Sequence, residues 1–431
     1  MEAPAASVVE NGSRAHEQRA IRRSRRGLCD LGGICWPYAR GVLTDRDIAR
    51  WRLHSQHLAA PVHGAEEAVH SLLAVQAENP SQSAWAVATR TLDPRQSDLA
   101  GLLSNGRVLR THVLRPTWHY VHAEDALWLI EATRDRVLPT VDQQLTPLAD
   151  GMSGLTDAVV ATLAASPDCT RAELADSLAQ RGHVLTGMQL MLLAAHLELH
   201  ALICSGVPRG AEHTYALFAD RVPSPRRLER EEALVELALR YFRSHGPATE
   251  RDLAYWATLT LTGARRGIAG AADRLVSFEH EGRTYWHAPG EPPVGAGPRG
   301  HLLQVLDEMY RGYQDSRWVL DAGGMLSRGR ETAIGMALVD GQVVAGMKRA
   351  VAAKTVTFDI RPLRSLESEE VEAIEDAAAR YAGYLELDPR LRWEESSDRA
   401  PAAAESARSA AARVRVNSSS HPTTRPAQTI S

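Results

Sequence analysis

The segment that decides the fold is residues 230–287, REEALVELALRYFRSHGPATERDLAYWATLTLTGARRGIAGAADRLVSFEHEGRTYWH. Its apolar residues first recur at helical spacing, a His-Gly-Pro break follows, and Thr249 stands where a helix cap is expected. The segment ends with two short runs joined by a Glu-Gly-Arg turn, which is typical of a β-hairpin. The predicted elements are helices over 230–244, 250–258 and up to about 275, followed by strands over 276–279 and 284–287. Three helices followed by a hairpin are the order of a winged helix.

The same order occurs twice more toward the N-terminus. The middle copy has predicted helices over 155–166, 171–181 and 187–200, with strands over 202–204 and 215–218. The first copy has predicted helices over 45–57, 66–76, 81–90 and 97–104, with a hairpin formed by 108–114 and 118–122. Three copies predict tandem winged-helix units, in a fold that is α+β but mainly helical.

A different pattern begins near residue 301. Short apolar runs flank an Asp340-Gly341 pair, which is a strong signal for a hairpin turn, and a predicted helix over 369–385 follows. We expect a small C-terminal β-rich domain here. The predicted organisation is a disordered basic N-terminal segment (1–41), winged-helix units over 42–150, 151–225 and 226–300, the β-rich domain over 301–392 and a disordered tail over 393–431.

Composition constrains the partners and the compartment. The chain has 431 residues, a formal net charge of −4 and 4 cysteines, which form no Cys-x-x-Cys pair. No disulfide framework or zinc motif is indicated, and no apolar run is long enough for a membrane span. We therefore expect a cytoplasmic protein that does not bind membranes. The charge does not exclude nucleic acid, because DNA binding requires only a locally basic surface.

The predicted hairpin of the first unit is such a surface. No Asp or Glu occurs from residue 99 through 123, while arginine, histidine and tryptophan gather there. Arginines can grip phosphates, and aromatic rings can stack on an unstacked base. The candidate DNA-binding residues are Arg107, Arg110, His112, Arg115, Trp118 and His119. The alternative is structural: Trp118 belongs to the core, and the arginines form a solvated edge.

The run Val75-Gln-Ala-Glu-Asn-Pro80 is the second signal, at the end of a predicted helix. With three other runs it resembles the bacterial AlkZ/YcaQ superfamily of winged-helix DNA glycosylases, which carry a Gln-x-Gln or Gln-x-Asp motif in a concave cleft. The other runs are Arg115-Pro-Thr-Trp-His119, Leu306-Asp-Glu-Met-Tyr310 with Gly312-Tyr-Gln-Asp315, and Val339-Asp-Gly-Gln-Val-Val344 with Gly346. The resemblance spans about residues 43–388.

The resemblance implies excision of bulky or cross-linking alkylated purines, with Gln76 and Glu78 as the catalytic pair. A carboxylate at Glu78 could orient and deprotonate the attacking water and stabilise the developing positive charge. The sequence departs from the superfamily at Glu78, where Gln or Asp is usual, and where Ser316 precedes Arg317. The alternative for Glu78 is a solvated carboxylate without a catalytic role. The resemblance adds Thr117 to the DNA contacts and assigns support of the cleft to Asn79, Asp307 and Tyr313.

An N7-alkylated purine is already a cationic leaving group, so such an enzyme does not require a strong general acid. We therefore expect a monofunctional glycosylase that leaves an abasic site and works without a metal or an organic cofactor. The expected partner is double-stranded DNA, which associates the protein with the nucleoid, and the expected state is a monomer. The alternatives are non-catalytic: a winged-helix transcriptional regulator, or a degenerate protein that binds lesions without cutting them.

Overall fold

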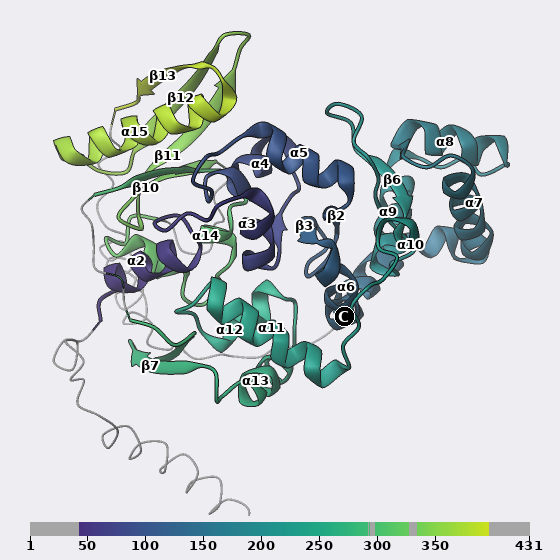
Figure 1. Ribbon diagram of the computed structural model, residues 1–431, viewed down its shortest axis with the longest axis horizontal. Helices are drawn as coiled ribbons and strands as arrows, with labels where there is room; N and C mark the ends of the chain where they lie inside the picture. Colours follow the sequence, from purple (N-terminus) through teal and green to yellow (C-terminus); the bar gives the residue numbers. More distant parts are fainter. Residues whose placement is uncertain (1–42, 292, 294–297, 327–333, 396–431) are drawn as a thin grey trace, which may run out of the picture. The chain divides into compact units, whose positions relative to one another are not determined.

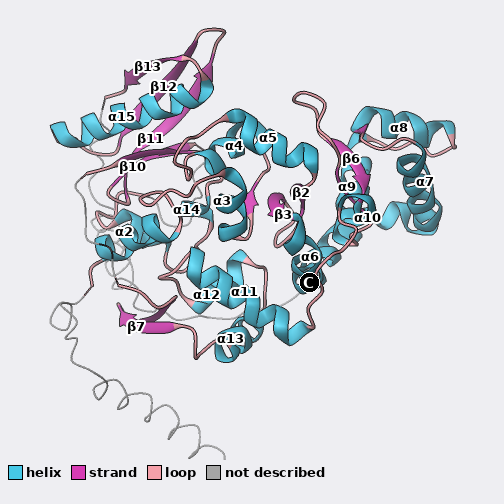
Figure 2. Cartoon of the chain, viewed as in Figure 1, coloured by secondary structure: helices cyan, strands magenta, loops and turns pink. Residues whose placement is uncertain are grey.

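The computed structural model describes residues 43–291, 293, 298–326 and 334–395. Within them the fold is α+β and mainly helical, which confirms the predicted class (Figures 1 and 2). The predicted disordered segment over 1–41 lies outside the described residues. The tail was predicted over 393–431, and its residues from 396 onward also lie outside the described residues. Its first residue, Trp393, instead ends a strand that the sequence did not predict.

Three segments of the described chain share one winged-helix topology. The first contains α3 (Ala65–Leu72), β1 (Val75–Gln76), α4 (Pro80–Ala88), α5 (Gln96–Asn105), β2 (Val108–His112) and β3 (Trp118–His122). The second contains α7 (Met152–Ala165), β4 (Cys169–Thr170), α8 (Arg171–Gln180), α9 (Gly187–Leu199), β5 (Ile203–Ser205) and β6 (Thr214–Leu217). The third contains α11 (Arg230–Ser244), α12 (Glu250–Trp256), α13 (Leu261–Gly270), β7 (Val276–His280) and β8 (Arg283–His287).

In each segment the short strand after the first helix pairs with the second strand of the hairpin. The sheet orders are β1-β3-β2 and β4-β6-β5, and in the third segment the single residue Ala248 bridges to Trp286 of β8. In the second segment the last residue of this strand, Thr170, caps the next helix through a capping box with Glu173. In the third segment Thr249, directly after Ala248, forms such a box with Asp252. The repeated strand pairing explains why the same order of helices and hairpin strands recurs along the sequence.

The strand β1 corrects the predicted helix over 66–76. The helix α3 ends at Leu72 because Leu73 adopts a left-handed φ of 70°. The next residues are extended and pair with β3, so Gln76 lies in a strand rather than at a helix end. Pro80 begins α4 instead of stopping the preceding helix.

Long helices and shared cores join the segments. Trp128 and Leu129 of α6 (Ala123–Leu145) are buried in one core with Leu237 and Trp256 from the third segment. The helix α2 (Asp45–Ser55), which we predicted as part of the first unit, instead buries Ile48 and Leu53 against the C-terminal region. The first helix of the described chain is thus joined to the C-terminal region through one core.

The C-terminal region contains a five-stranded sheet in the order β13-β12-β11-β10-β9. Its elements are β9 (Gly300–Leu303), α14 (Glu308–Arg311), η2 (Arg317–Asp321), β10 (Gly335–Val339), β11 (Gln342–Val351), β12 (Thr355–Pro362), α15 (Ser368–Leu385) and β13 (Asp388–Trp393). Asp340 and Gly341 have φ values of 53° and 76° and join β10 to β11, which confirms the predicted hairpin turn. No helix of the described ranges is long and apolar enough to cross a membrane.

Candidate active site

Gln76 lies at the centre of the candidate site because of the pairing of β1 with β3. It is directly opposite His119 in this antiparallel pair, so both residues belong to the same face of the sheet. The Gln76 backbone N–H donates to Glu308 Oε1 at 2.9 Å, and its side-chain Oε1 accepts from the Arg115 guanidinium at 3.3 Å. With only 7% of its surface exposed, Gln76 is held in one orientation.

Arg115 and His119 fix each other. His119 Nδ1 lies 3.0 Å from the Thr117 carbonyl, so it must be the protonated nitrogen that donates. Its Nε2 lies 3.1 Å from Arg115 Nη2 and therefore accepts. Burial, followed by the positive charge of Arg115, lowers the pKa of His119 to about 3, so the ring stays neutral at physiological pH. A neutral ring is the form that can accept from a guanidinium.

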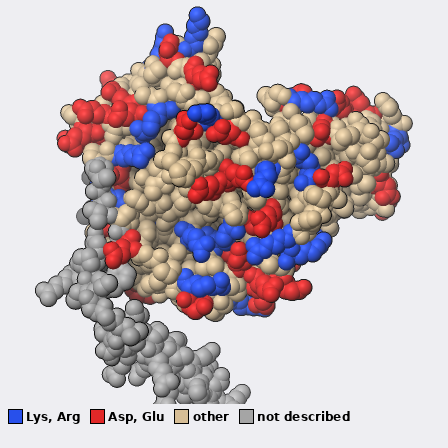
Figure 3. Space-filling model, viewed as in Figure 1, with Lys and Arg blue, Asp and Glu red and all other residues tan. Residues whose placement is uncertain are grey.

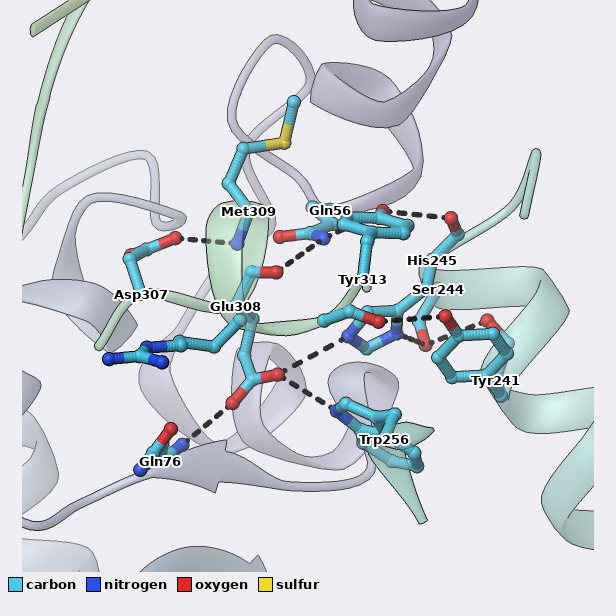
Figure 4. A network of polar contacts seen from close by, with 12 residues as sticks. Gln56, Gln76, Tyr241, Ser244, His245, Trp256, Asp307, Glu308, Met309 and Tyr313 are labelled. Carbon is cyan, nitrogen blue, oxygen red and sulfur yellow. Dashed lines mark hydrogen bonds and ion pairs between the residues drawn. The ribbon is translucent and has the colours of Figure 1, made fainter. Parts of the chain in front are cut away.

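Glu308 is the buried acid of the site (Figure 4). Its carboxylate accepts from the Trp256 indole N–H at 2.8 Å and from the Gln76 backbone, and it lies 3.7 Å from the Arg115 guanidinium. His245 Nε2 is 3.6 Å away. Burial alone would raise the pKa of Glu308, but contact with His245 and the charge of Arg115 lower it to about 2. The carboxylate therefore remains ionised and balances Arg115.

Asp307 and Tyr313 support this cluster from behind. Arg90 donates to both Asp307 oxygens at 2.8 and 2.9 Å, and Asp307 Oδ1 accepts the backbone N–H of Met309 in α14. The Tyr313 hydroxyl donates to the His245 carbonyl at 2.8 Å. Gln56 connects the two, because its amide donates to the Tyr313 hydroxyl and its Oε1 accepts from Arg90. These side chains position α14, and therefore Glu308.

A cavity of about 540 Å³ opens beside Gln76. It is lined by Gln76, Arg115, Pro116, Thr117, Arg136, Ala254, Tyr255, Thr258, Leu259, Leu306 and Arg311. Its polar lining is basic, since three of these residues are arginines and none is acidic. The Thr117 hydroxyl is buried and has no hydrogen-bond partner in the described part of the chain. The cavity therefore offers cationic and hydroxyl donors to a bound molecule.

Glu78 and Asn79 lie where β1 ends. The N–H of Ala77 still donates to the Trp118 carbonyl at 2.7 Å, and the next bond of the ladder is replaced by the Glu78 side chain, whose Oε2 accepts the Trp118 N–H at 3.3 Å. Both residues are exposed. Asn79 precedes α4 but makes no side-chain cap, and it lines a small recess together with Gln76. Glu78 is therefore accessible to DNA, while one of its oxygens also stabilises the strand end.

The prediction that Arg110, His112 and Trp118 contact DNA needs correction, because all three are buried. The Arg110 guanidinium lies 4.3 Å over the Trp118 ring, and its Nε donates to the Ala77 carbonyl at 2.9 Å. His112 contacts the fully buried carboxylate of Glu198 in α9. The acid that balances these groups comes from the second segment, so the absence of acids in the hairpin sequence does not make its surface basic.

The remaining predicted DNA contacts are placed differently. Arg107 is more than half exposed, but its Nε donates to Glu66 at 2.8 Å. Arg115 and Thr117 line the cavity, and His119 lies behind Arg115 without any exposure of its own. On the face shown in Figure 3, basic and acidic side chains alternate. Of the predicted DNA-contacting residues, only Arg115 and Thr117 thus line the cavity.

Glu308 is the functional residue that the sequence analysis missed. It stood inside the run Leu306-Asp-Glu-Met-Tyr310, from which only Asp307 was selected. A signal was present, because two adjacent acids precede apolar residues and cannot both cap the same short helix. Asp307 takes the cap, which leaves Glu308 for the buried cluster.

Comparisons with known proteins agree with this geometry. The family model described as DNA glycosylase AlkZ-like matches residues 69–384. The chain belongs to the AlkZ-like DNA glycosylase family. The protein is therefore a DNA glycosylase, a hydrolase that acts on DNA. Its fold is similar to that of the Streptomyces sahachiroi DNA glycosylase AlkZ, with a TM-score of 0.65 and 21% identity over 82% of this chain and 100% of that chain. No curated protein matches the sequence.

Proposed function

We propose that this glycosylase hydrolyses the N-glycosidic bond of bulky or cross-linking N7-alkylated purines in duplex DNA and leaves an abasic site. The observation that carries the proposal is the fixed orientation of Gln76. Its amide oxygen is held by Arg115 and its backbone by Glu308, at the rim of the cavity and next to an exposed carboxylate. An amide and a carboxylate held in this way can aim one water at C1′ of the deoxyribose.

The water lies between Gln76 and Glu78 in this proposal. Two residues that are two positions apart along an extended chain are separated by about 6.5 Å. One water spans most of that distance, since each of its hydrogen bonds covers about 2.8 Å. Glu78 accepts the proton as the water attacks, and its negative charge stabilises the oxocarbenium-like sugar. Gln76 does not titrate and serves to orient the water.

The cavity receives the sugar-phosphate backbone rather than the alkylated base. Arg115, Arg136 and Arg311 would repel a cationic purine, whereas their guanidinium groups suit phosphate oxygens. The Thr117 hydroxyl adds a donor that the protein leaves without a partner in the described structure. The base then lies outside the three arginines, toward the negative charge of Glu78.

This placement suits a cross-linked substrate. A purine joined covalently to the opposite strand cannot rotate into a closed pocket, as base-flipping enzymes require. An attack on C1′ from the rim of an open cavity needs no such rotation. The cationic base leaves without a general acid, which agrees with the absence of acidic residues from the cavity lining.

A glycosylase that also cleaves the strand does so through an amine that forms a Schiff base with the sugar. The chain contains only two lysines, Lys348 and Lys354, and neither lines the cavity. We therefore propose a monofunctional enzyme. We also propose that it acts as a monomer, because every group invoked above comes from one chain.

The test is base release by the purified full-length protein without added metal. Duplexes with one N7-methylguanine or one nitrogen-mustard cross-link are incubated, the free base is measured by mass spectrometry, and abasic sites are revealed by hot alkali. We expect base release, with strand breaks only after alkali. Binding of either duplex without release would support the degenerate lesion binder, and breaks before alkali would contradict monofunctional action.

A further inference from the structure

A second group of side chains lies on the opposite face of β3 from the candidate site. His119 and His122 are three positions apart on this strand, so their side chains point to opposite faces. On its own face, His122 meets His70 from α3 and Glu124 from the first turn of α6. Each of the three residues offers one ligand atom, and these atoms lie within 4.8 Å of one another.

The surroundings of His122 are those of a metal-ligating histidine. Its Nε2 lies 3.1 Å from Glu66 Oε1, while its Nδ1 is buried and has no hydrogen-bond partner in the described ranges. Only 7% of His122 is exposed, so water does not readily satisfy that nitrogen. Histidines that bind metals usually donate their other ring N–H to a carboxylate, which fixes the tautomer and leaves a lone pair for the ion.

His70 has a similar second partner. Its Nε2 lies 3.5 Å from the buried carboxylate of Asp125, and its ring lies 4.9 Å from that of His122. Asp125 is itself balanced by Arg240, and Glu66 by Arg107. Glu124 is exposed and is not one of these balanced carboxylates, so it is the acid that remains to offset an added cation.

We propose that His70, His122 and Glu124 bind one divalent transition-metal ion of the zinc type, with water as a fourth ligand. Two imidazoles and one carboxylate favour zinc over magnesium or calcium, which prefer oxygen ligands. Ligand atoms around tetrahedral zinc lie about 3.3 Å apart, given metal–ligand distances of about 2.0 Å. His70 and Glu124 are exposed and can rotate to close the remaining gap around His122.

Such an ion has a structural role. It joins the end of α3 to the junction at which β3 passes directly into α6. It is separate from the chemistry proposed above, because His119 and Gln76 lie on the other face of the strand. Metal binding can therefore be tested without any measurement of base release.

The experiment uses the full chain, stripped with EDTA, dialysed and titrated with zinc chloride in a calorimeter. We expect one ion per chain. His70→Ala and His122→Ala should each weaken binding at least 100-fold, and Glu66→Gln should weaken it about 10–100-fold through His122. Cobalt in place of zinc should give the visible absorption of a tetrahedral site in the wild type and lose it in His122→Ala.

His196 and His200 provide the matched control. They are four residues apart at the end of α9, and their rings lie 4.5 Å apart, so they form another histidine pair that could take up zinc. The double variant His196→Ala/His200→Ala should bind as the wild type does. Circular dichroism checks that each variant folds, and the exposed Glu124→Gln, expected to bind at least tenfold more weakly, replaces any variant that does not. Absence of zinc binding, or loss of binding only in the α9 variant, would overturn the proposal.

Discussion

The first and second winged-helix segments share a topology but differ where the short strand meets the next helix. In the second segment, Thr170 ends β4 and caps α8 at once, and it is opposite Thr214 in the sheet. In the first segment, Gln76 ends β1 opposite His119, and residues 77–79 intervene before α4 begins at Pro80. The third segment resembles the second at this junction, since Thr249 caps α12 directly after Ala248.

In the proposed function, this difference is what gives one structural repeat a reactive site. A threonine cap stabilises a helix by about 1 kcal/mol, and the first segment forgoes it, because Asn79 makes no side-chain cap. In exchange, the three additional residues carry Glu78 to the surface beside Gln76. The same comparison predicts which substitutions affect the chemistry and which affect only the fold.

The largest expected effect is on the rate of base release. Glu78→Ala should lower it by about 10²–10⁴-fold, the range attributed to a positioned acid–base group, while DNA affinity stays within a few-fold. Glu78→Asp and Glu78→Gln should retain part of the activity, as the resemblance to the superfamily implies. Single-turnover assays of base release and fluorescence anisotropy measure the two quantities.

The matched control is Glu173→Ala in the second segment. Glu173 is also an exposed acid close to the strand–helix junction, where it completes the Thr170 capping box. Its loss should leave the rate of base release unchanged. Equal loss of activity in Glu78→Ala and Glu173→Ala would show that the effect comes from helix stability, and that the three-residue extension has no special chemical role.

Two buried acids contact the first segment, Glu308 from the C-terminal region and Glu198 from the second segment, and they should differ in their effect on stability. Glu308→Gln leaves Arg115 buried without its counter-charge, and we expect a loss of about 3–5 kcal/mol in the free energy of unfolding. Glu198→Gln should cost only about 1–3 kcal/mol, because its contacts with His112 and the Trp118 indole are hydrogen bonds, which an amide can partly replace. Urea denaturation at neutral pH measures both values, and equal losses would contradict the assignment of Arg115 as the charge that Glu308 balances.

A smaller effect should appear when the pH is lowered. The pKa of His119 falls from 6.5 to about 3 on folding, so the unfolded chain binds a proton that the folded protein refuses. The stability from this residue is complete above pH 6.5 and is lost as the pH falls toward 3, by up to about 1.4 kcal/mol per pH unit. Between pH 6.5 and 5, His119→Gln should therefore lose about 1–2 kcal/mol less than the wild type. Parallel pH profiles of the two proteins would refute a neutral, buried His119.

The smallest expected effect concerns the salt dependence of DNA binding. Arg136→Ala removes an exposed arginine of the cavity and should lower the slope of log affinity against log salt by about one. Arg110→Ala should leave this slope unchanged, because Arg110 is buried over Trp118. The reverse result would place the DNA backbone on the hairpin rather than in the cavity.

Local patterns predicted the repeated units and the Asp340-Gly341 hairpin, because helical spacing, caps and turn residues act over a few positions. They did not predict that Gln76 lies in a strand, since its partner His119 is 43 positions away by residue number. Glu308 and Glu198 were missed for the same reason: each meets its partner, Arg115 or His112, only in the folded chain. Conversely, the arginine-rich hairpin looked like an exposed DNA surface because its acidic partner belongs to α9.

The distance in sequence between Gln76 and Glu308 bears on how the enzyme is made. The two residues are 232 positions apart, and a hydrogen bond joins the Gln76 backbone to the Glu308 carboxylate. A ribosome therefore releases α14 only after it has synthesised all three winged-helix segments. A partly synthesised or truncated chain can expose folded segments to the chromosome, but it lacks the acid that orders Gln76. We therefore expect base excision only from chains that include α14, so that incomplete copies of the enzyme make no abasic sites.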